Sequence, residues 1–438
     1  MLNAMERSVR IITHGCRLNQ AESALLRDLF CEAGWSLAAE NTPADLVVVN
    51  TCCVTGLAEA KCRQSIRQAI NRNPNAFIAV IGCLPQAHTH DFTQWEGVDL
   101  IVGNDAKLKL PELVGPAKKN KKPVEICAPL ARNDFKVPFM ADPDPFPQRA
   151  NLKVQDGCNF ACAYCIIPKA RGAPRSRDFD DALAEARTLA ARGVRELVLT
   201  GVNIGKYANQ GRDFLDLLDA LAQIKGIDRL RISSIEPTTV PADGLFKRMR
   251  DNTHPLLPYL HLPIQSGSEK ILERMRRRYT LREVLDFARH AAASVPEIGL
   301  GTDILVGHPG EGPDEFEQTC RSFLESPFQY AHVFSYSERP GTLSAKMPDA
   351  VPIAQRHRRS AILRALSAKK HRAWAKGFLE ETVEVLFENP RPDYWPGLTG
   401  NFLRVIARDG RDLRNRLARV KLLRLCGDAV EGEVLEIL

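Results

Sequence analysis

The sequence predicts an α/β protein in three parts: a doubly wound parallel sheet, an open (β/α)6 partial barrel and a small C-terminal β-barrel. Three observations predict this fold class. The N-terminal part alternates strand-like and helix-like runs as β-α-β-α-β, which is typical of a parallel sheet. The middle of the chain continues with six strand-then-helix units. The C-terminal part carries closely spaced short strands, which indicate a small barrel.

The chain has 438 residues, and at about 150 residues per domain this length suggests about three domains. We expect an N-terminal domain over 1–115, a linker over 116–148, a barrel domain over 149–375 and a C-terminal domain over 376–438. The linker is predicted from the basic run over 118–122 and from prolines that interrupt any regular element. These prolines are Pro138, Pro143, Pro145 and Pro147.

The composition is ordinary, with 44% hydrophobic and 26% charged residues. No run of about 18 apolar residues occurs, and the first residues lack the layout of a signal peptide. Twelve cysteines are too few for a disulfide scaffold of this length, so they point to metal binding or catalysis in a reducing compartment. We therefore expect a cytoplasmic protein with no membrane partner. The net charge of +7 permits a polyanionic partner.

In the N-terminal part, strands are predicted over 9–13, 46–50 and 77–81, and amphipathic helices over 21–33 and 57–71. Cys16, Cys52 and Cys83 each follow the carboxyl end of one of these strands. The carboxyl ends of parallel strands share one edge of a sheet, so we expect the three thiols to meet there. A single cysteine is more often a small buried hydrophobe, but three at equivalent strand ends predict an iron–sulfur cluster. Cys53 is a rival for Cys52, and only one of the two is expected to ligate.

The barrel part begins with a C-x-x-x-C-x-x-C run, formed by Cys158, Cys162 and Cys165. Three soft thiolates at this spacing can hold three corners of an iron–sulfur cube and leave one iron open to a small molecule. A structural zinc site has four protein ligands, and no second C-x-x-C or H-x-x-x-H pair lies nearby. The run therefore predicts a cluster rather than zinc, although structural cysteines grouped by chance are an alternative.

The barrel strands are predicted over 151–155, 195–200, 229–233, 259–263, 299–305 and 330–334. In such barrels the active site lies at the carboxyl ends of the strands, where polar and glycine-rich loops follow here. The cysteine spacing, with Tyr164 before the third cysteine, resembles the signature of radical S-adenosylmethionine (SAM) enzymes. This resemblance implies that SAM chelates the open iron and that the loops contact SAM. The candidate contacts are Tyr164, Thr200, Glu236, Gln265 and Asp303. It also favours nucleotide or SAM contacts for Arg171 and Arg175. His308 departs from the aromatic residue that is usual at this position in the enzymes that the sequence resembles.

Essentially the whole chain resembles the methylthiotransferase family of radical SAM enzymes. The segments that carry the likeness are Thr-His-Gly-Cys-Arg-Leu-Asn-Gln-Ala-Glu at 13–22, Asn-Thr-Cys at 50–52 and Gly-Cys-Leu-Pro-Gln at 82–86. The resemblance implies an auxiliary 4Fe–4S cluster on Cys16, Cys52 and Cys83, in addition to the 4Fe–4S cluster on Cys158, Cys162 and Cys165. It selects Cys52 over Cys53, and Asn19 and Glu22 match family positions.

The tail carries strand-like runs over 382–387, 400–406, 418–423 and 432–437, and it resembles the RNA-binding TRAM module. Phe402 stands at the aromatic position of that module. With Tyr394 and Trp395 it suits stacking on RNA bases, which adds to phosphate contacts. The basic stretch over 355–372 before the tail is typical of a solvated helix face, and it can also follow a phosphate backbone.

The family resemblance implies insertion of a methylthio group at carbon 2 of an adenosine beside a tRNA anticodon, with SAM as radical source and methyl donor. The implied partners are the tRNA anticodon stem-loop, a reductant such as flavodoxin and a sulfur donor. The segments at 16–20, 199–203 and 231–236 look most like the branch that acts on N6-threonylcarbamoyladenosine. The alternatives are N6-isopentenyladenosine in tRNA, a ribosomal-protein aspartate, or a non-enzymatic RNA-binding protein with structural zinc.

Overall fold

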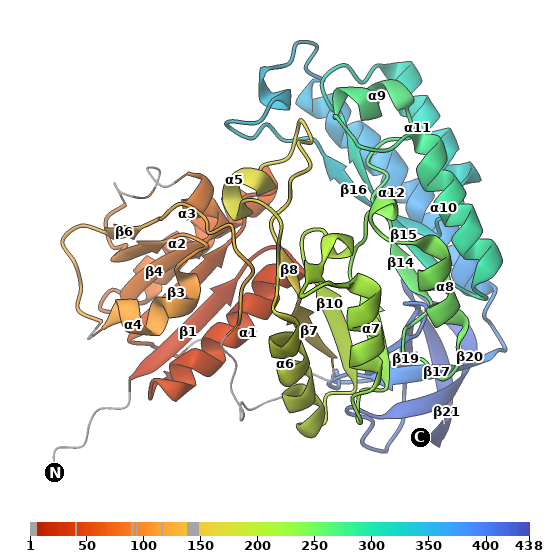
Figure 1. Ribbon diagram of the computed structural model, residues 1–438, viewed down its shortest axis with the longest axis horizontal. Coiled ribbons are helices and arrows are strands. Elements are labelled where there is room, and N and C mark those ends of the chain that lie inside the picture. Colours follow the sequence, from red (N-terminus) through yellow and green to blue (C-terminus); the bar gives the residue numbers. More distant parts are fainter. Residues whose placement is uncertain (1–6, 40–41, 89–91, 93–94, 116, 138–148) are drawn as a thin grey trace.

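The computed structural model describes residues 7–39, 42–88, 92, 95–115, 117–137 and 149–438 (Figure 1). The four prolines predicted to interrupt the linker, at 138–147, lie outside the described residues. Within the described part, no helix combines the length and apolarity that crossing a bilayer needs.

The N-terminal domain is a six-stranded, all-parallel sheet in the order β2-β1-β3-β4-β5-β6. Both central strands, β3 and β4, are buried on both faces, because their nearly continuous apolar runs are covered by helices on each side. The strands are β1 (Ser8–Thr13), β2 (Ser36–Leu37), β3 (Leu46–Thr51), β4 (Phe77–Gly82), β5 (Leu100–Val102) and β6 (Val124–Ile126). The helices are α1 (Arg17–Glu32), α2 (Gly56–Arg72), α3 (Cys83–Ala87) and α4 (Leu110–Val114). Strand β6 lies within 116–148, the segment predicted to be a linker.

The central domain is the open barrel that the sequence predicts, in two three-stranded parallel sheets with the orders β13-β10-β7 and β14-β15-β16. Between the sheets, β13 bonds to the segment at 255–257 rather than to a continuous β14. Pro255 and Pro258 lack the N–H groups that a longer ladder would use. The strands are β7 (Arg149–Lys153), β10 (Glu196–Thr200), β13 (Arg229–Ile232), β14 (Tyr259–His261), β15 (Gly299–Val306) and β16 (Tyr330–Ser335).

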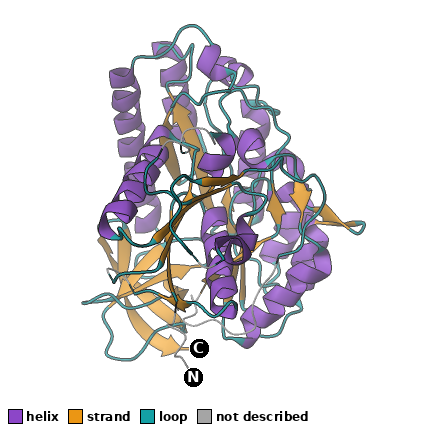
Figure 2. Ribbon diagram, turned by 90° about the vertical axis from the view of Figure 1, so that its left-hand side faces the viewer, coloured by secondary structure: helices purple, strands orange, loops and turns teal. Residues whose placement is uncertain are grey.

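Helices cover the outer face of this barrel, and its strands lie inside them (Figure 2). Alternate strand residues point outward into one large apolar core, for example Leu260, Leu300 and Val333. The helices are α5 (Ile167–Arg171), α6 (Phe179–Ala191), α7 (Phe214–Ala222), α8 (Ala242–Arg250), α9 (Glu269–Arg274), α10 (Leu281–Ser294), α11 (Pro313–Glu325) and α12 (Ile353–Lys376). Short pairs β8 (Gln155–Asp156) with β9 (Arg175–Ser176), and β11 (Ala208–Asn209) with β12 (Arg212–Asp213), lie in the connections.

The C-terminal domain is a closed five-stranded barrel in the order β17-β18-β19-β21-β20. Its strands are β17 (Thr382–Phe387), β18 (Trp395–Thr399), β19 (Arg404–Ala407), β20 (Leu417–Cys426) and β21 (Ala429–Ile437). The predicted strand over 400–406 is wrong in its first half, because 400–403 forms the turn between β18 and β19. Phe402 has a φ of 74°, which no strand accommodates.

This turn docks the small barrel against the central one. Arg231 donates from Nη1 to the carbonyl of Gly400 at 2.9 Å, and Asn401 donates to the carbonyl of Glu297 at 3.0 Å. The Phe402 ring stacks on Tyr259 with centroids 4.7 Å apart. The expected RNA-stacking aromatic therefore packs against Tyr259, at the amino-terminal end of barrel strand β14.

Candidate functional site

The C-x-x-x-C-x-x-C run lies in the loop between β8 and α5, beyond the carboxyl end of β7. Two donors point at its sulfur atoms: the N–H of Phe160 reaches Sγ of Cys158 at 3.3 Å, and Nη1 of Arg277 reaches Sγ of Cys162 at 3.3 Å. Burial raises the pKa of all three thiols, that of Cys165 to about 12. Iron binding would favour the thiolate forms, and both donors stabilise negative sulfur. The three residues can therefore supply thiolates to three of the four irons of a 4Fe–4S cluster.

Arg277 connects this loop to Glu236. Both guanidinium Nη2 bonds to the Glu236 carboxylate are 2.6 Å long, and Nη1 also lies 3.5 Å from the hydroxyl of Tyr164. Burial raises the pKa of Glu236, and Arg277 opposes that rise. The structure thus places two predicted SAM contacts, Tyr164 and Glu236, beside the cysteine loop. Sequence reasoning missed Arg277, whose only signal was its place in a run of three arginines at 276–278.

His308 lies behind Tyr164. The two rings meet edge to face at 6.4 Å, and the ring of Tyr336 lies 5.5 Å away on another side. The imidazole is fully buried, and its Nε2 lies 2.7 Å from Oγ of Ser344. Burial lowers the pKa of His308 to about 4, so the ring is neutral at physiological pH.

Of the remaining predicted SAM contacts, Gln265 and Asp303 are joined by a backbone hydrogen bond of 2.8 Å, from the N–H of Gln265 to the carbonyl of Asp303. Thr200 is buried, and its hydroxyl donates to the carbonyl of Val198 at 3.1 Å. Gln265 has a φ of 65°, and its carbonyl also accepts from the N–H of Leu305 on β15 at 2.8 Å. Asp303 lies within β15 rather than at its end.

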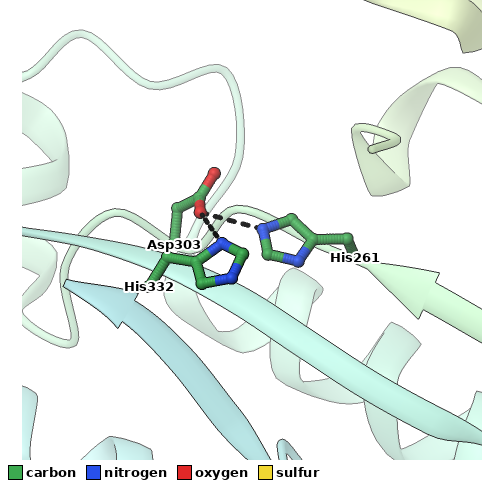
Figure 3. A group of neighbouring side chains, drawn as sticks. All are labelled: His261, Asp303 and His332. Atoms are coloured by element: carbon green, nitrogen blue, oxygen red, sulfur yellow. Dashed lines mark hydrogen bonds and ion pairs between the residues drawn. The ribbon is translucent and has the colours of Figure 1, made fainter. Parts of the chain in front are cut away.

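The Asp303 carboxylate lies between two histidines on the inner face of the barrel (Figure 3). Its Oδ1 is 2.9 Å from Nε2 of His261 on β14 and 3.4 Å from Nδ1 of His332 on β16. Among the described residues, this is the one group of three His, Cys, Asp or Glu ligand atoms that all lie within 4.8 Å of one another. The His332 side chain is 57% exposed, so the barrel interior reaches solvent along β16. Sequence reasoning missed both histidines, because only the barrel register brings them to Asp303.

The three N-terminal cysteines converge at one edge of the sheet, as predicted. Cys16 precedes α1, Cys83 begins α3, and Cys52 follows β3. Gly15 comes so close that a Cβ there would lie 2.8 Å from Sγ of Cys52. Burial and then the neighbouring Cys83 raise the pKa of Cys52 to about 12. Two further cysteines, Cys53 and Cys62, are completely buried nearby.

A buried ionic network joins this edge to the cysteine loop of the barrel. Arg171 is 1% exposed and donates to Asn19, to Asp156 and to Glu22. Lys107 and Lys153 also donate to Glu22. Arg171 is therefore a structural residue between the domains, although the sequence favoured a SAM or nucleotide contact for it.

The network fits an anionic group at the sheet edge. Three buried cations, Lys107, Lys153 and Arg171, face two buried carboxylates, Glu22 and Asp156. Cys83 and Glu22 raise the pKa of Arg171 against the effect of burial. The Asn104 amide nitrogen lies 3.4 Å from Sγ of Cys83. An excess of positive charge beside three cysteines suits thiolate ligands of an iron–sulfur cluster.

A cavity of about 460 Å³ lies where the three domains meet. Arg17 and Gln20 of α1, Arg149 and Asn151 of β7, and Arg391 of the small barrel line it. Asn151 pairs in register with Val198 of β10, which also lines the cavity. With three arginines and one carboxylate, from Glu388, the cavity wall is polar and cationic.

Comparison with known proteins agrees with this architecture. Residues 152–323 match the model of the Radical SAM superfamily, and residues 8–103 match that of Uncharacterized protein family UPF0004. The chain is 33% identical over 442 residues to the threonylcarbamoyladenosine tRNA methylthiotransferase MtaB of Bacillus subtilis (strain 168), covering 98% of this chain and 97% of that protein. It is 32% identical over 447 residues to the tRNA-2-methylthio-N(6)-dimethylallyladenosine synthase of Cronobacter sakazakii, covering 98% and 93%.

Among solved structures, the radical SAM methyltransferase TsrM from Kitasatospora setae shares the fold, with a TM-score of 0.55 at 14% identity over 78% of this chain and 77% of that one. The radical SAM fold implies SAM and one 4Fe–4S cluster, and Cys158, Cys162 and Cys165 fit that cluster. Similarity over nearly the full length, together with the cysteine loop at the barrel mouth, shows that the chain belongs to the radical SAM tRNA methylthiotransferase family.

Proposed function

We propose that this enzyme inserts a methylthio group at carbon 2 of N6-threonylcarbamoyladenosine beside a tRNA anticodon. Two of the similar proteins, from Bacillus subtilis and Aquifex aeolicus, carry the name of that activity. The choice of this modified adenosine over the isopentenyl one rests on the cationic cavity where the three domains meet. A threonylcarbamoyl group bears a carboxylate, which arginines bind well, whereas an isopentenyl group would favour an apolar wall.

We also assign a second 4Fe–4S cluster to Cys16, Cys52 and Cys83. The convergence of these cysteines and the excess positive charge beside Cys83 support it. When bound, the two clusters with SAM would supply a 5′-deoxyadenosyl radical and a methylated sulfur, which functionalise a C–H bond that acid–base catalysis cannot ionise.

The residues of the chain have positioning tasks in this reaction. Arg277 and Glu236 hold the cysteine loop at the barrel mouth, and the rings of Tyr164 and His308 pack edge to face behind it. The network around Arg171 fixes the distance between the two cysteine sets, because it bonds to Asn19 on α1 and to Asp156 before the loop. SAM contacts by Thr200, Gln265 and Asp303 remain part of the proposal.

The proposal includes the tRNA anticodon stem-loop as substrate, a reductant such as flavodoxin, a sulfur donor and a cytoplasmic location. The proposed domains are 1–115, 149–375 and 376–438, with β6 of the intervening segment added to the first sheet. A base in an anticodon loop can be turned out of its stack without opening a duplex, which suits entry into a barrel.

The second candidate substrate is N6-isopentenyladenosine, favoured by the similarity to the Cronobacter sakazakii enzyme. Nucleoside mass spectrometry of tRNA from cells that lack the gene, with and without the gene on a plasmid, separates the two. We expect loss and restoration of the 2-methylthio form of threonylcarbamoyladenosine alone. Loss of the isopentenyl form instead would refute the proposal.

A further inference from the structure

The cavity where the domains meet contains cationic and polar atoms that have no partner in the protein. The Arg17 side chain makes no hydrogen bond or ion pair among the described residues, although it is half-buried. Nη1 of Arg149 and Oδ1 of Asn151 are buried and make no hydrogen bond in the described part of the chain. Leaving such groups unsatisfied costs stability, so a ligand that completes them is expected.

The unsatisfied atoms define the chemistry of that ligand. Arg17 and Arg149 offer guanidinium donors, which match a carboxylate or a phosphate. Asn151 offers an acceptor, which needs an N–H or O–H group on the ligand. Glu388 engages the other terminal nitrogen of Arg149, so the cavity retains free positive charge on Arg17. Burial and the adjacent Arg149 charge lower the pKa of Arg17, which an anion would reverse.

We infer that Arg17, Arg149 and Asn151 bind the threonyl end of the modified adenosine: its carboxylate lies on the two arginines, and a hydroxyl or ureido N–H donates to Asn151. This inference rests on the proposed function and names the residues that select the substrate. The cavity wall formed by Asn151 and Val198 faces the barrel interior. Arg17 directly follows Cys16, whereas Arg149 and Asn151 begin β7, at the strand end opposite the cysteine loop, so a substituent held here reaches through the barrel interior from a base at the barrel mouth.

The test measures binding of anticodon stem-loop RNAs to the reconstituted enzyme by fluorescence anisotropy. The RNAs carry threonylcarbamoyladenosine, its methyl ester, or unmodified adenosine. We expect the free acid to bind roughly ten- to hundred-fold more tightly than the ester, as for a charge-assisted hydrogen bond. Arg17→Gln should abolish this preference, and Asn151→Leu should weaken acid and ester alike.

Arg195→Gln is the matched control, since Arg195 pairs with Asp228 outside the cavity; it should keep the preference. Iron content and thermal unfolding confirm that each variant is folded. If Arg17→Gln weakens the binding of all three RNAs equally, the anion that Arg17 binds is a backbone phosphate, and the inference is overturned. If the acid and ester bind alike to the unchanged enzyme, the inference also fails. Nucleoside mass spectrometry reports separately on the proposed function.

A different observation concerns the distribution of surface charge. Helix α12 carries eight Lys and Arg residues and no Asp or Glu. Three of the eight are held inside by Glu338, Glu311 and backbone carbonyls. The other five are exposed and have no ion pair among the described residues: Arg358, Arg364, Lys369, Arg372 and Lys376.

The small barrel has the opposite balance. Residues 377–438 hold nine Lys and Arg against eleven Asp and Glu. Five of the nine cations, including Arg411, Arg419 and Arg424, are paired with carboxylates. Its surface is therefore a poor match for a phosphate backbone, contrary to what its resemblance to an RNA-binding module suggests.

Helix α12 also lies next to the side of the barrel that opens to solvent. Ser367 on α12 accepts from the N–H of Ala331 on β16 at 2.8 Å, and His371 contacts Tyr330 at 6.0 Å. The neighbouring His332 is an exposed residue of the inner face. If a nucleotide of the tRNA enters the barrel past β16, the RNA strand that carries it would run along α12.

We propose that the exposed face of α12, more than the small barrel, is the phosphate-binding surface for the tRNA stem. The test compares the triple variant Arg364→Gln, Lys369→Gln and Arg372→Gln with a control triple, Arg411→Gln, Arg419→Gln and Arg424→Gln. Glutamine keeps helix propensity close to that of Lys and Arg. Affinity for unmodified tRNA is measured over a range of salt concentrations.

The α12 triple should lower the slope of log affinity against log salt by about 2 to 3, near 0.9 for each lost phosphate contact, and the control triple should change it little. An unchanged slope for the α12 triple, or a larger loss for the control triple, would overturn the proposal. So would unchanged RNA affinity combined with loss of binding to phosphatidylserine vesicles, which would assign the face to a membrane surface.

Discussion

At the residue scale, neighbouring cysteines are expected to behave differently. Cys52 lies against Gly15, one residue from Cys16, and beside Cys83, whereas Cys53 follows it on the chain and is completely buried. Cys52→Ala should therefore remove about half of the iron of the reconstituted protein while SAM cleavage survives, uncoupled from methylthiolation. Cys53→Ala should keep the full iron content and SAM cleavage. Iron analysis and quantification of 5′-deoxyadenosine check this, and iron loss only in the Cys53 variant would exchange the two roles.

His308 should make the barrel sensitive to acid. Its pKa is about 4 in the fold and near 6.5 when unfolded, so the unfolded chain binds the proton first. The stability that it contributes as a neutral ring is present above pH 6.5 and is lost as the pH falls towards 4, by up to about 3 kcal/mol. His308→Phe should unfold with a weaker pH dependence over this window. Thermal unfolding of the two holoproteins at pH 7 and pH 5 compares them, and parallel curves would contradict the assignment.

At the scale of elements, the turn between β18 and β19 is expected to depend on a glycine of the central barrel. A Cβ at Gly299 would lie 2.0 Å from the carbonyl oxygen of Asn401, a backbone atom that cannot move alone. Gly299→Ala should therefore loosen the small barrel and lower stability by about 1–3 kcal/mol. Limited proteolysis should release a fragment beginning near the end of α12.

Gly410 is the matched control, since nothing lies within 4 Å of a Cβ there. Gly410→Ala should leave both the proteolysis pattern and the unfolding temperature unchanged. Equal protease resistance of the Gly299 variant would show that the turn tolerates displacement.

At the scale of the whole molecule, the buried network around Glu22 joins the first domain to the second. Arg171, Lys107 and Lys153 hold the pKa of Glu22 well below its usual value, although burial alone would raise it. The stability that the ionised carboxylate contributes is therefore present at neutral pH and is lost as the pH falls through the acid range. Glu22→Gln leaves three buried cations with one carboxylate and should cost about 3–5 kcal/mol.

Glu317→Gln, in an exposed pair with Arg321, is the comparison and should change stability by less than about 1 kcal/mol. Denaturant unfolding of both variants measures the difference. A Glu22→Gln protein as stable as the comparison would mean that the network does not hold the domains together.

Strands β1, β3 and β4 of the first domain and the six strands of the barrel follow from the sequence, because continuous apolar runs and turn residues are local signals. The short strands β2, β5 and β6 were not predicted. The cysteine sets follow for the same reason: one is contiguous, and the other repeats at strand ends whose common edge is a rule of parallel sheets. The small barrel was predicted with four strands, and β18 was missed because Pro390, Pro392 and Pro396 obscure the strand signal.

The sequence by itself determined the three-part architecture, the family resemblance and the cysteines, since each depends on residue order over short distances. Only the tertiary structure decided that Arg171 joins two domains, that Phe402 packs on Tyr259 and that His261 and His332 meet Asp303. It also decided that Arg17 and Arg149, which are far apart in sequence, share one cavity. Burial and pairing of charges depend on which distant segments come into contact, and the order of residues along the chain does not state this.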